Sequence, residues 1–239
     1  MSGAARYGIY FAPAAKSKLW RFGCDWLGRD VEAGEERARP PIAGPAADDW
    51  SAAELSDLTA SPRLYGFHGT LKPPFRLAAG ETRESLCSAV AAFARSRSPF
   101  VAADVDVAAL GRFIAFRLIR DDSAVRDLAA ATVETFDRFR APAPPEELAK
   151  RRASGLTPGQ DALLERWGYP YVMDEFRFHL TLTGPIADAA RRERLAAVLR
   201  RMAAARGAIG PLAVDGVAIY EQSGEGGPFW LFRRLPFGG

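Results

Sequence analysis

The chain of 239 residues contains two histidines, and each lies in a copy of the same short motif. The first copy reads FHGTLKPPF and the second reads FHLTLTGPI, so five of nine positions are identical. Alternate side chains of a β-strand share a face, which places His68 beside Thr70 and His179 beside Thr181. The sequence therefore predicts an imidazole and a hydroxyl presented together, twice.

These residue types suit the hydrolysis of a strained cyclic phosphodiester. Water attacks phosphorus on one side while the ester oxygen departs on the other, so the reaction needs a proton acceptor and a proton donor. Histidine serves as either near neutral pH. Threonine hydroxyls and nearby cations stabilise the charge that develops on the phosphate oxygens. Lys72, two residues beyond Thr70, is expected on the same strand face and adds a positive charge.

The motif belongs to a longer internal repeat. Each copy is followed by a helical pattern, over residues 82–96 and 188–205, with Thr82 and Asp188 as expected N-caps. Strand-like segments and the pattern G-x-F-x-x-F-R come next in both copies. In addition, a strand and a helix precede each histidine strand. We interpret residues 1–239 as a single bilobal domain with repeats at about 62–120 and 172–237.

This order of elements predicts an α+β fold. We expect two pseudo-symmetric lobes, each an antiparallel sheet with outer helices, that face each other across a central cleft. One His-x-Thr strand from each lobe lines that cleft. The motif's Phe67, Phe178, Leu71 and Leu182 point the other way and are expected to pack in the core.

Two stretches interrupt the symmetry. Residues 30–50 indicate a long loop, which leads to a short helix that begins with the capping box of Ser51 and Glu54. Residues 141–170 are rich in Ala and Pro at first and contain a helix that starts after Thr157 and ends at Gly168. This second insertion forms either a lid over the site or a linker between the lobes.

The composition limits the class of protein. With 48% hydrophobic and 26% charged residues, the chain is typical of a folded globular protein. A net charge of +3 favours a small partner over a long nucleic acid. No apolar run approaches the roughly 18 residues that span a bilayer and no signal-peptide pattern is present, so we expect no membrane association and a cytoplasmic location. Cys24 and Cys87 are too few for a disulfide framework and are expected in the core.

Other catalytic patterns are weaker or missing. Asp174 and Glu175 lie near His179 and leave a metal site open, although no third ligand has a recognisable spacing. The G-x-S-x-G elbow of serine hydrolases and the glycine-rich loops of nucleotide-binding proteins do not occur. The chemistry expected from the paired motifs needs no metal and no cofactor, and no feature of the sequence indicates a protein partner.

The paired motifs resemble the two-histidine (2H) phosphoesterase superfamily, which includes RNA 2′,3′-cyclic phosphodiesterases and 2′-5′ RNA ligase-like proteins. The resemblance covers nearly the whole chain. The long motif YGFHGTLKPPF, together with the 141–170 insertion, is similar to the branch associated with bacterial phosphonate-utilisation operons.

The resemblance implies roles for particular residues. His68 and His179 would be the acid and the base, and Thr70 and Thr181 would hold the phosphate. Members of the superfamily often place a further Tyr, Lys or Arg near the phosphate; the candidates in this chain are Lys72, Tyr10, Arg177 and Tyr220.

The expected function is a metal-independent hydrolase for a small 2′,3′- or 1,2-cyclic phosphate of a ribose-type substrate. One alternative is the same chemistry on RNA ends, with Trp167, Tyr169 and Tyr171 as stacking residues. Another is a phosphate-binding module without turnover.

Overall fold

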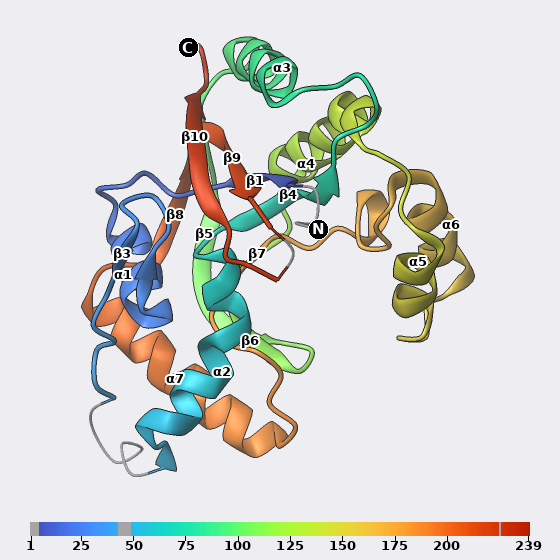
Figure 1. Ribbon diagram of the computed structural model, residues 1–239. Helices are drawn as coiled ribbons and strands as arrows, with labels where there is room; N and C mark the ends of the chain where they lie inside the picture. The colour runs from blue at the N-terminus through green and yellow to red at the C-terminus, as the bar shows by residue number, and fades with distance from the viewer. Residues whose placement is uncertain (1–4, 43–48, 225) are drawn as a thin grey trace.

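The computed structural model describes residues 5–42, 49–224 and 226–239 as helices and strands arranged around one large sheet (Figure 1). The strands are β1 (Arg6–Phe11), β2 (Arg29–Asp30), β3 (Glu35–Glu36), β4 (Gly69–Arg76), β5 (Phe100–Leu110), β6 (Phe113–Leu118), β7 (His179–Thr181), β8 (Gly210–Val214), β9 (Gly216–Gln222) and β10 (Trp230–Pro236). The helices are α1 (Lys18–Leu27), α2 (Ala52–Tyr65), α3 (Arg83–Arg95), α4 (Ser123–Phe136), α5 (Pro145–Arg152), α6 (Pro158–Trp167) and α7 (Ala189–Ala205), with the short 3₁₀ turns η2 (Asp137–Phe139) and η3 (Met173–Glu175).

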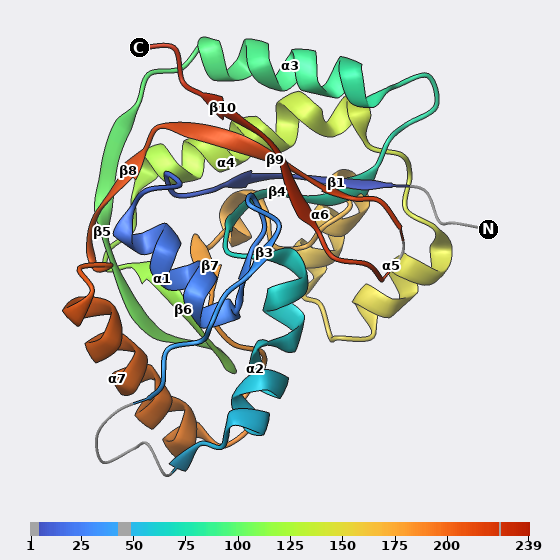
Figure 2. The same ribbon diagram turned by 60° about the vertical axis from the view of Figure 1, so that its left-hand side comes forward.

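The central sheet has eight strands in the order β10-β9-β1-β4-β7-β6-β5-β8, and every neighbouring pair is antiparallel. It divides into two similar four-stranded halves that meet where Gly69 of β4 pairs with Leu180 of β7. Figure 2 shows the sheet curling, so that β5 and β8 rise beside the strands of the other half. The predicted α+β fold with two pseudo-symmetric antiparallel halves is confirmed, and the two histidine strands form the seam between them.

The chain crosses between the halves more than once. Strands β5 and β6, which follow the first histidine strand, pair on the β7 side, whereas β9 and β10 return to the β4 side. The 62–120 repeat is therefore shared between the two halves and does not build one of them alone. The unit that each half does retain is a strand, a helix and a histidine strand, as β1-α1-β4 and β6-α4-β7.

The helices begin where the sequence predicts. Side chains of Ser51, Thr82, Thr157 and Asp188 accept hydrogen bonds from the first-turn amides of α2, α3, α6 and α7. The helix α2 is longer than expected, with 14 residues and Pro62 inside it. The preceding stretch carries the small β2–β3 ladder, and residues 43–48 of the predicted loop lie outside the described residues. Polar caps at these positions stabilise helix starts because they satisfy otherwise unpaired amides.

The core lies against both halves of the sheet. Helices α3 and α4 pack together through Phe93 and Phe136, and α4 covers β4. Helix α1 packs its Phe22 edge-on against Phe116 of β6, and α7 covers β5. Helices α1 and α4, which each lead to the histidine strand of one half, thus pack on the other half, whereas α7 covers a strand of its own half. This exchange buries the apolar faces of both halves in one continuous core.

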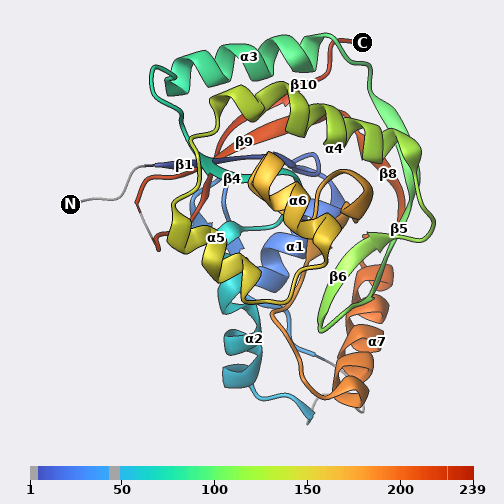
Figure 3. The ribbon, with the colours of Figure 1, turned by 90° about the vertical axis from the view of Figure 1, so that its right-hand side faces the viewer.

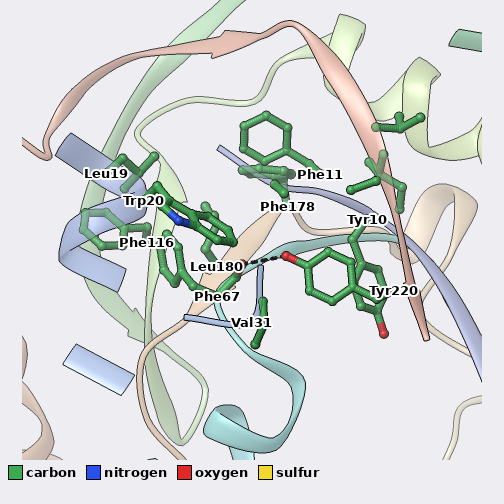
Figure 4. Close-up of a cluster of buried hydrophobic side chains, with 14 of the residues drawn as sticks. Tyr10, Phe11, Leu19, Trp20, Val31, Phe67, Phe116, Phe178, Leu180 and Tyr220 are labelled. Atoms are coloured by element: carbon green, nitrogen blue, oxygen red, sulfur yellow. Dashed lines mark hydrogen bonds between the residues drawn. The ribbon is translucent and has the colours of Figure 1, made fainter. Parts of the chain in front are cut away.

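The motif's apolar residues anchor the histidine strands in this core, as predicted. Phe67, Phe178, Leu71 and Leu182 are all buried. Figure 4 shows Phe67 and Leu180 among aromatic side chains from β1, α1 and β6. Gly23 of α1 is required here, because a Cβ at that position would lie 2.1 Å from the Phe67 ring. The close approach of α1 fixes the residue immediately before His68.

Residues 141–170 form the helices α5 and α6, which lie together in front of the central strands in Figure 3.

Cys24 and Cys87 are both buried, as predicted, and neither forms a disulfide. No helix within the described ranges is long and apolar enough to cross a bilayer.

Candidate active site

The two His-x-Thr segments lie side by side at the seam of the sheet. His68 immediately precedes β4 and His179 is the first residue of β7. Each imidazole is held in the same way: Nδ1 of His68 lies 2.9 Å from the Gly66 carbonyl, and Nδ1 of His179 lies 2.7 Å from the Arg177 carbonyl. A carbonyl oxygen only accepts, so both Nδ1 atoms carry hydrogen, and the Nε2 atoms of the neutral rings are free to accept a proton.

Two adjoining cavities open at these histidines. We call the first the His68 cavity; it has a volume of about 360 Å³ and is lined by His68, Thr70 and Thr181, among others. The second, the His179 cavity, has a volume of about 420 Å³ and is lined by His179. Both are bordered by the same four residues, Thr70, Pro73, Phe113 and Tyr169. A His-x-Thr segment from each half thus contributes to these adjoining cavities.

Both imidazoles are half-buried, and their removal from water favours the neutral form. Removal from water lowers the pKa of His68 to about 4, with a smaller contribution from the nearby His179, and it also lowers the pKa of His179. The Thr70 hydroxyl lies 3.2 Å from Nε2 of His68 and donates to it in this state. An anionic ligand in the cleft would favour the protonated form of either imidazole and raise its pKa.

Buried hydrogen bonds hold the segment that precedes His68 in place. The hydroxyl of Tyr220 donates to the Phe67 carbonyl over 3.2 Å (Figure 4). The guanidinium of Arg29 donates to the carbonyls of Arg63 and Leu64 at the end of α2 and to that of Phe229. These bonds satisfy the last carbonyls of α2 and hold the turn that presents His68.

Tyr10 of β1 is the aromatic neighbour of His68. Its ring lies on the imidazole, and its side chain is fully buried and lines the His68 cavity. The hydroxyl has no hydrogen-bond partner within the described residues. Burial raises the pKa of Tyr10 well above its ordinary value, so the hydroxyl stays protonated and remains a donor.

The prediction that Lys72 shares a face with Thr70 is wrong. Tyr10 pairs with Thr70 and the next residue back, Ile9, pairs with Lys72, so Leu71 is an extra residue in β4. Because of this bulge, Thr70 and Lys72 lie on opposite faces of the sheet.

The ammonium group of Lys72 is instead buried beneath α4. It donates to the Asp137 carboxylate over 3.1 Å and to the Val133 carbonyl over 3.2 Å. Burial lowers the pKa of Lys72 to about 8, although the charge of Asp137 acts in the opposite direction. Lys72 is therefore a structural link between β4 and α4, and it does not line either cavity.

The other two ligand-binding candidates differ from each other. Tyr220 does not line either cavity, because its hydroxyl is already bonded to Phe67, and the prediction that it contacts the substrate is not supported by this position. Arg177 is exposed, lines the His179 cavity and offers its carbonyl to His179.

The structure adds lining residues that the motif did not indicate. Arg6 at the start of β1 and Arg151 of α5 both line the His68 cavity, as does Tyr169. Arg151 and Tyr169 belong to the 141–170 insertion, so this insertion contributes directly to the site. Two features of the sequence could have indicated these residues. Arg6 lies four residues before Tyr10 and so shares its strand face, and Arg151 lies in a run of three basic residues.

Asp174 and Glu175 do not assemble a metal site with His179. Across the part of the chain that the structure describes, no three His, Cys, Asp or Glu side chains cluster as metal ligands. The Glu175 carboxylate instead accepts a hydrogen bond of 3.0 Å from Gln160.

The fold and the site define a class of protein in which two pseudo-symmetric halves each present a His-x-Thr strand at their seam, in agreement with the resemblance to two-histidine phosphoesterases. Among family models, the one described as "Protein of unknown function (DUF1045)" matches residues 70–230. This match covers more than half of the chain, and the protein belongs to the DUF1045 family.

The chain is also similar to two curated proteins. It is 40% identical over 238 residues to "Ribose 1,5-bisphosphate phosphokinase PhnN" of Janthinobacterium sp. (strain Marseille), covering 98% of this chain and 51% of that protein. It is 34% identical over 230 residues to a protein of the same name from Laribacter hongkongensis (strain HLHK9), covering 96% of this chain and 51% of that protein. The chain thus spans about half the length of these curated relatives.

Among solved structures, the crystal structure of E. coli LigT complexed with 3′-AMP aligns with a TM-score of 0.47 and 15% identity. The alignment covers 99% of this chain and 100% of that one.

Proposed function

We propose that the protein is a phosphodiesterase that opens a small 2′,3′- or 1,2-cyclic phosphate of a ribose-type compound by histidine acid-base catalysis, without a metal. The observation that carries this proposal is the equivalent anchoring of the two imidazoles. Each donates Nδ1–H to the carbonyl two residues earlier, and each lines one of two adjoining cavities. A pair of proton carriers on either side of one cleft suits in-line displacement at phosphorus.

The two histidines account for both proton transfers in the reaction. The neutral imidazole of one histidine accepts a proton from water at Nε2 while the water oxygen bonds to phosphorus. The ester bond opposite breaks, and the departing alkoxide takes a proton from the other histidine, which is protonated. The product is a phosphate monoester with a free hydroxyl. The Thr70 and Thr181 hydroxyls donate to the phosphate oxygens as their charge increases.

Binding of the substrate prepares the acid. Removal from water lowers the pKa of each imidazole, which favours the neutral form of both. The negative charge of the cyclic diester raises these values, so one proton is taken up on binding.

The class of substrate is supported by the relatives. Both relatives are named ribose 1,5-bisphosphate phosphokinases, which favours a phosphorylated ribose over other cyclic esters. The chain contains no P-loop motif, so the kinase activity in those names does not extend to our proposal for this chain. With the long motif that is similar to the phosphonate-operon branch, we place the activity in phosphonate utilisation.

The test is hydrolysis in the presence of EDTA of three kinds of substrate: nucleoside 2′,3′-cyclic phosphates, ribose 1,2-cyclic phosphate and an RNA oligomer that ends in a cyclic phosphate. We expect turnover of a small substrate, and a loss of roughly a hundredfold or more in His68→Ala and in His179→Ala. Circular dichroism and thermal unfolding show whether each variant keeps its fold. Full activity in either variant would exclude the mechanism, and preference for the RNA oligomer would favour an RNA-end enzyme.

A further inference from the structure

The His68 cavity contains more positive charge than one cyclic diester requires. Arg6 and Arg151 both line it, and its described lining residues include no Asp or Glu. A cyclic phosphodiester carries a single negative charge, which the two threonine hydroxyls and a protonated histidine already match. The two guanidinium groups therefore point to a second anionic group on the ligand.

Arg6 keeps its charge available. Its Nε donates to the side-chain carbonyl of Gln222 over 2.7 Å, and that partner is neutral. Among the described residues, no carboxylate lies within ion-pair distance of Arg6. The Gln222 bond orients the guanidinium without neutralising it, which is a suitable arrangement for binding an anion.

Arg151 is only partly neutralised. It lies 3.2 Å from the Glu147 carboxylate, but the other oxygen of that carboxylate lies 3.1 Å from Arg76. One negative charge is thus shared by two guanidinium groups, and a net positive charge remains. The guanidinium of Arg151 also stacks over the ring of Tyr169, 5.0 Å from its centroid, which fixes it at the cavity wall.

The unpartnered hydroxyl of Tyr10 lies over Gly8, on the face of β1 that carries Arg6. Arg6, Gly8 and Tyr10 share a face of β1, since the β1–β9 ladder is regular over these residues. A Cβ on Gly8 would lie 2.6 Å from the Tyr10 hydroxyl, so the ring extends along β1 toward Arg6. A buried donor without a partner is costly unless a ligand satisfies it.

We infer that Arg6, Arg151 and the Tyr10 hydroxyl form a second phosphate subsite, which binds a phosphomonoester carried by the same substrate molecule. A phosphomonoester has close to two negative charges at pH 7 and matches two guanidinium groups better than a diester does. The inference rests on the proposed function, which places the cyclic phosphate between the histidines. It defines the substrate class as a ribose-type cyclic phosphate with a terminal phosphate on its exocyclic hydroxyl.

A small substrate fits this subsite better than RNA. Both arginines line one cavity of about 360 Å³, and Tyr169 of the 141–170 insertion lines it as well. An RNA strand would present singly charged diesters and would need an open groove beyond the cavity.

The experiment compares two matched substrates, ribose 1,2-cyclic phosphate with and without a phosphate on the 5-hydroxyl. We expect the wild-type protein to prefer the 5-phosphorylated compound by roughly a hundredfold in kcat/KM. In Arg6→Gln and in Arg151→Gln this preference falls about tenfold, mainly through KM. Arg201→Gln is the matched control, because Arg201 is exposed on α7 and lines neither cavity, and its preference equals that of the wild type.

The outcomes separate the two ideas. Turnover of both compounds at equal kcat/KM leaves the phosphodiesterase standing and overturns the subsite. A preference that survives in both arginine variants also overturns it. Failure of the wild type on both compounds, and on the nucleoside and RNA substrates above, contradicts the proposed function itself. If an RNA oligomer is the best substrate and loses its advantage in Arg6→Gln, the arginines bind an RNA backbone and the small-substrate assignment is wrong.

Discussion

The ring of Tyr10 is stacked on the imidazole of His68, with the two ring centroids 3.9 Å apart and the planes inclined by 20°. The stack joins β1 to β4 across the pair Tyr10–Thr70, so the residue that faces the first threonine also supports the first histidine. The contact excludes water from one face of the imidazole, and this burial is the main reason for the low pKa of His68.

Two substitutions can therefore separate the role of the Tyr10 ring from that of its hydroxyl. Tyr10→Phe keeps the stacked ring and removes only the hydroxyl, so we expect KM to rise about tenfold with a small change in kcat. Tyr10→Ala also exposes His68, and we expect kcat to fall at least tenfold further. Steady-state kinetics of both variants measure this difference. Equal effects of the two substitutions would show that only the hydroxyl matters, and an unchanged Tyr10→Phe would show that only the ring matters.

Gly8 is expected to be essential for the position of Tyr10. A Cβ at residue 8 would lie 2.4 Å from the Tyr10 ring, which closely packed neighbours cannot relieve without moving that ring. We expect Gly8→Ala to lower the free energy of unfolding by about 1–3 kcal/mol and to reduce turnover. Gly159→Ala is the control, since the nearest atom to its Cβ is 4.0 Å away and α6 tolerates alanine. Similar behaviour of the two variants in urea unfolding and kinetics would contradict this assignment.

The two histidines give a direct test of the electrostatics by NMR, because the chain contains no others. The pKa of His68 is about 4 in the folded protein, against about 6.5 in an unfolded chain. The unfolded state binds more protons between these values, so His68 contributes a loss of stability as the pH falls from about 6.5 to about 4. His68→Gln is expected to flatten this part of the stability curve.

The same titration shows proton uptake by the site. Inorganic phosphate as a probe ligand is expected to raise the pKa of at least one imidazole. The Cε1–H signals are followed against pH with and without phosphate, and His68→Gln assigns them. A pKa near 6.5 for His68 without phosphate would contradict the buried position described above.

The two threonines are expected to act through their hydroxyls. Thr70→Val and Thr181→Val keep the shape of the side chain, and we expect each to lower kcat about tenfold to a hundredfold through lost transition-state hydrogen bonds. Thr→Ser at the same positions retains the hydroxyl and should keep most of the activity. A serine variant as impaired as the valine variant would indicate a packing role for the methyl group.

Lys72 and Asp137 are expected to affect stability rather than chemistry. The Lys72 ammonium is nearly inaccessible, with 2% side-chain exposure, whereas Asp137 keeps two hydrogen bonds to Arg140 if Lys72 is removed. Lys72→Met should therefore lower the free energy of unfolding by about 1 kcal/mol or less. Asp137→Asn leaves a buried charge without its counter-ion and should cost about 3 kcal/mol. Urea unfolding measures which variant loses more stability. A larger loss in Lys72→Met than in Asp137→Asn would contradict the buried ion pair described above.

The paired His-x-Thr segments, the burial of their flanking residues and the helix starts could all be predicted from the sequence. These features depend on local rules: strand alternation separates His68 from Phe67, and polar side chains such as Ser51 and Thr82 satisfy free amides at a helix start. The repetition of the motif also predicted that the fold has two similar halves.

Which charged groups reach the cleft depends instead on contacts between segments far apart in the sequence. The extra residue at Leu71 reverses the face on which Lys72 lies, and a bulge of this kind depends on pairing with β1, which is far away in sequence. Arg6 and Arg151 lie 145 positions apart and line one cavity, because β1 pairs with β4 in the sheet and Glu147 of α5 forms an ion pair with Arg76 at the end of β4. Long-range pairing and packing, which no local pattern records, set these positions.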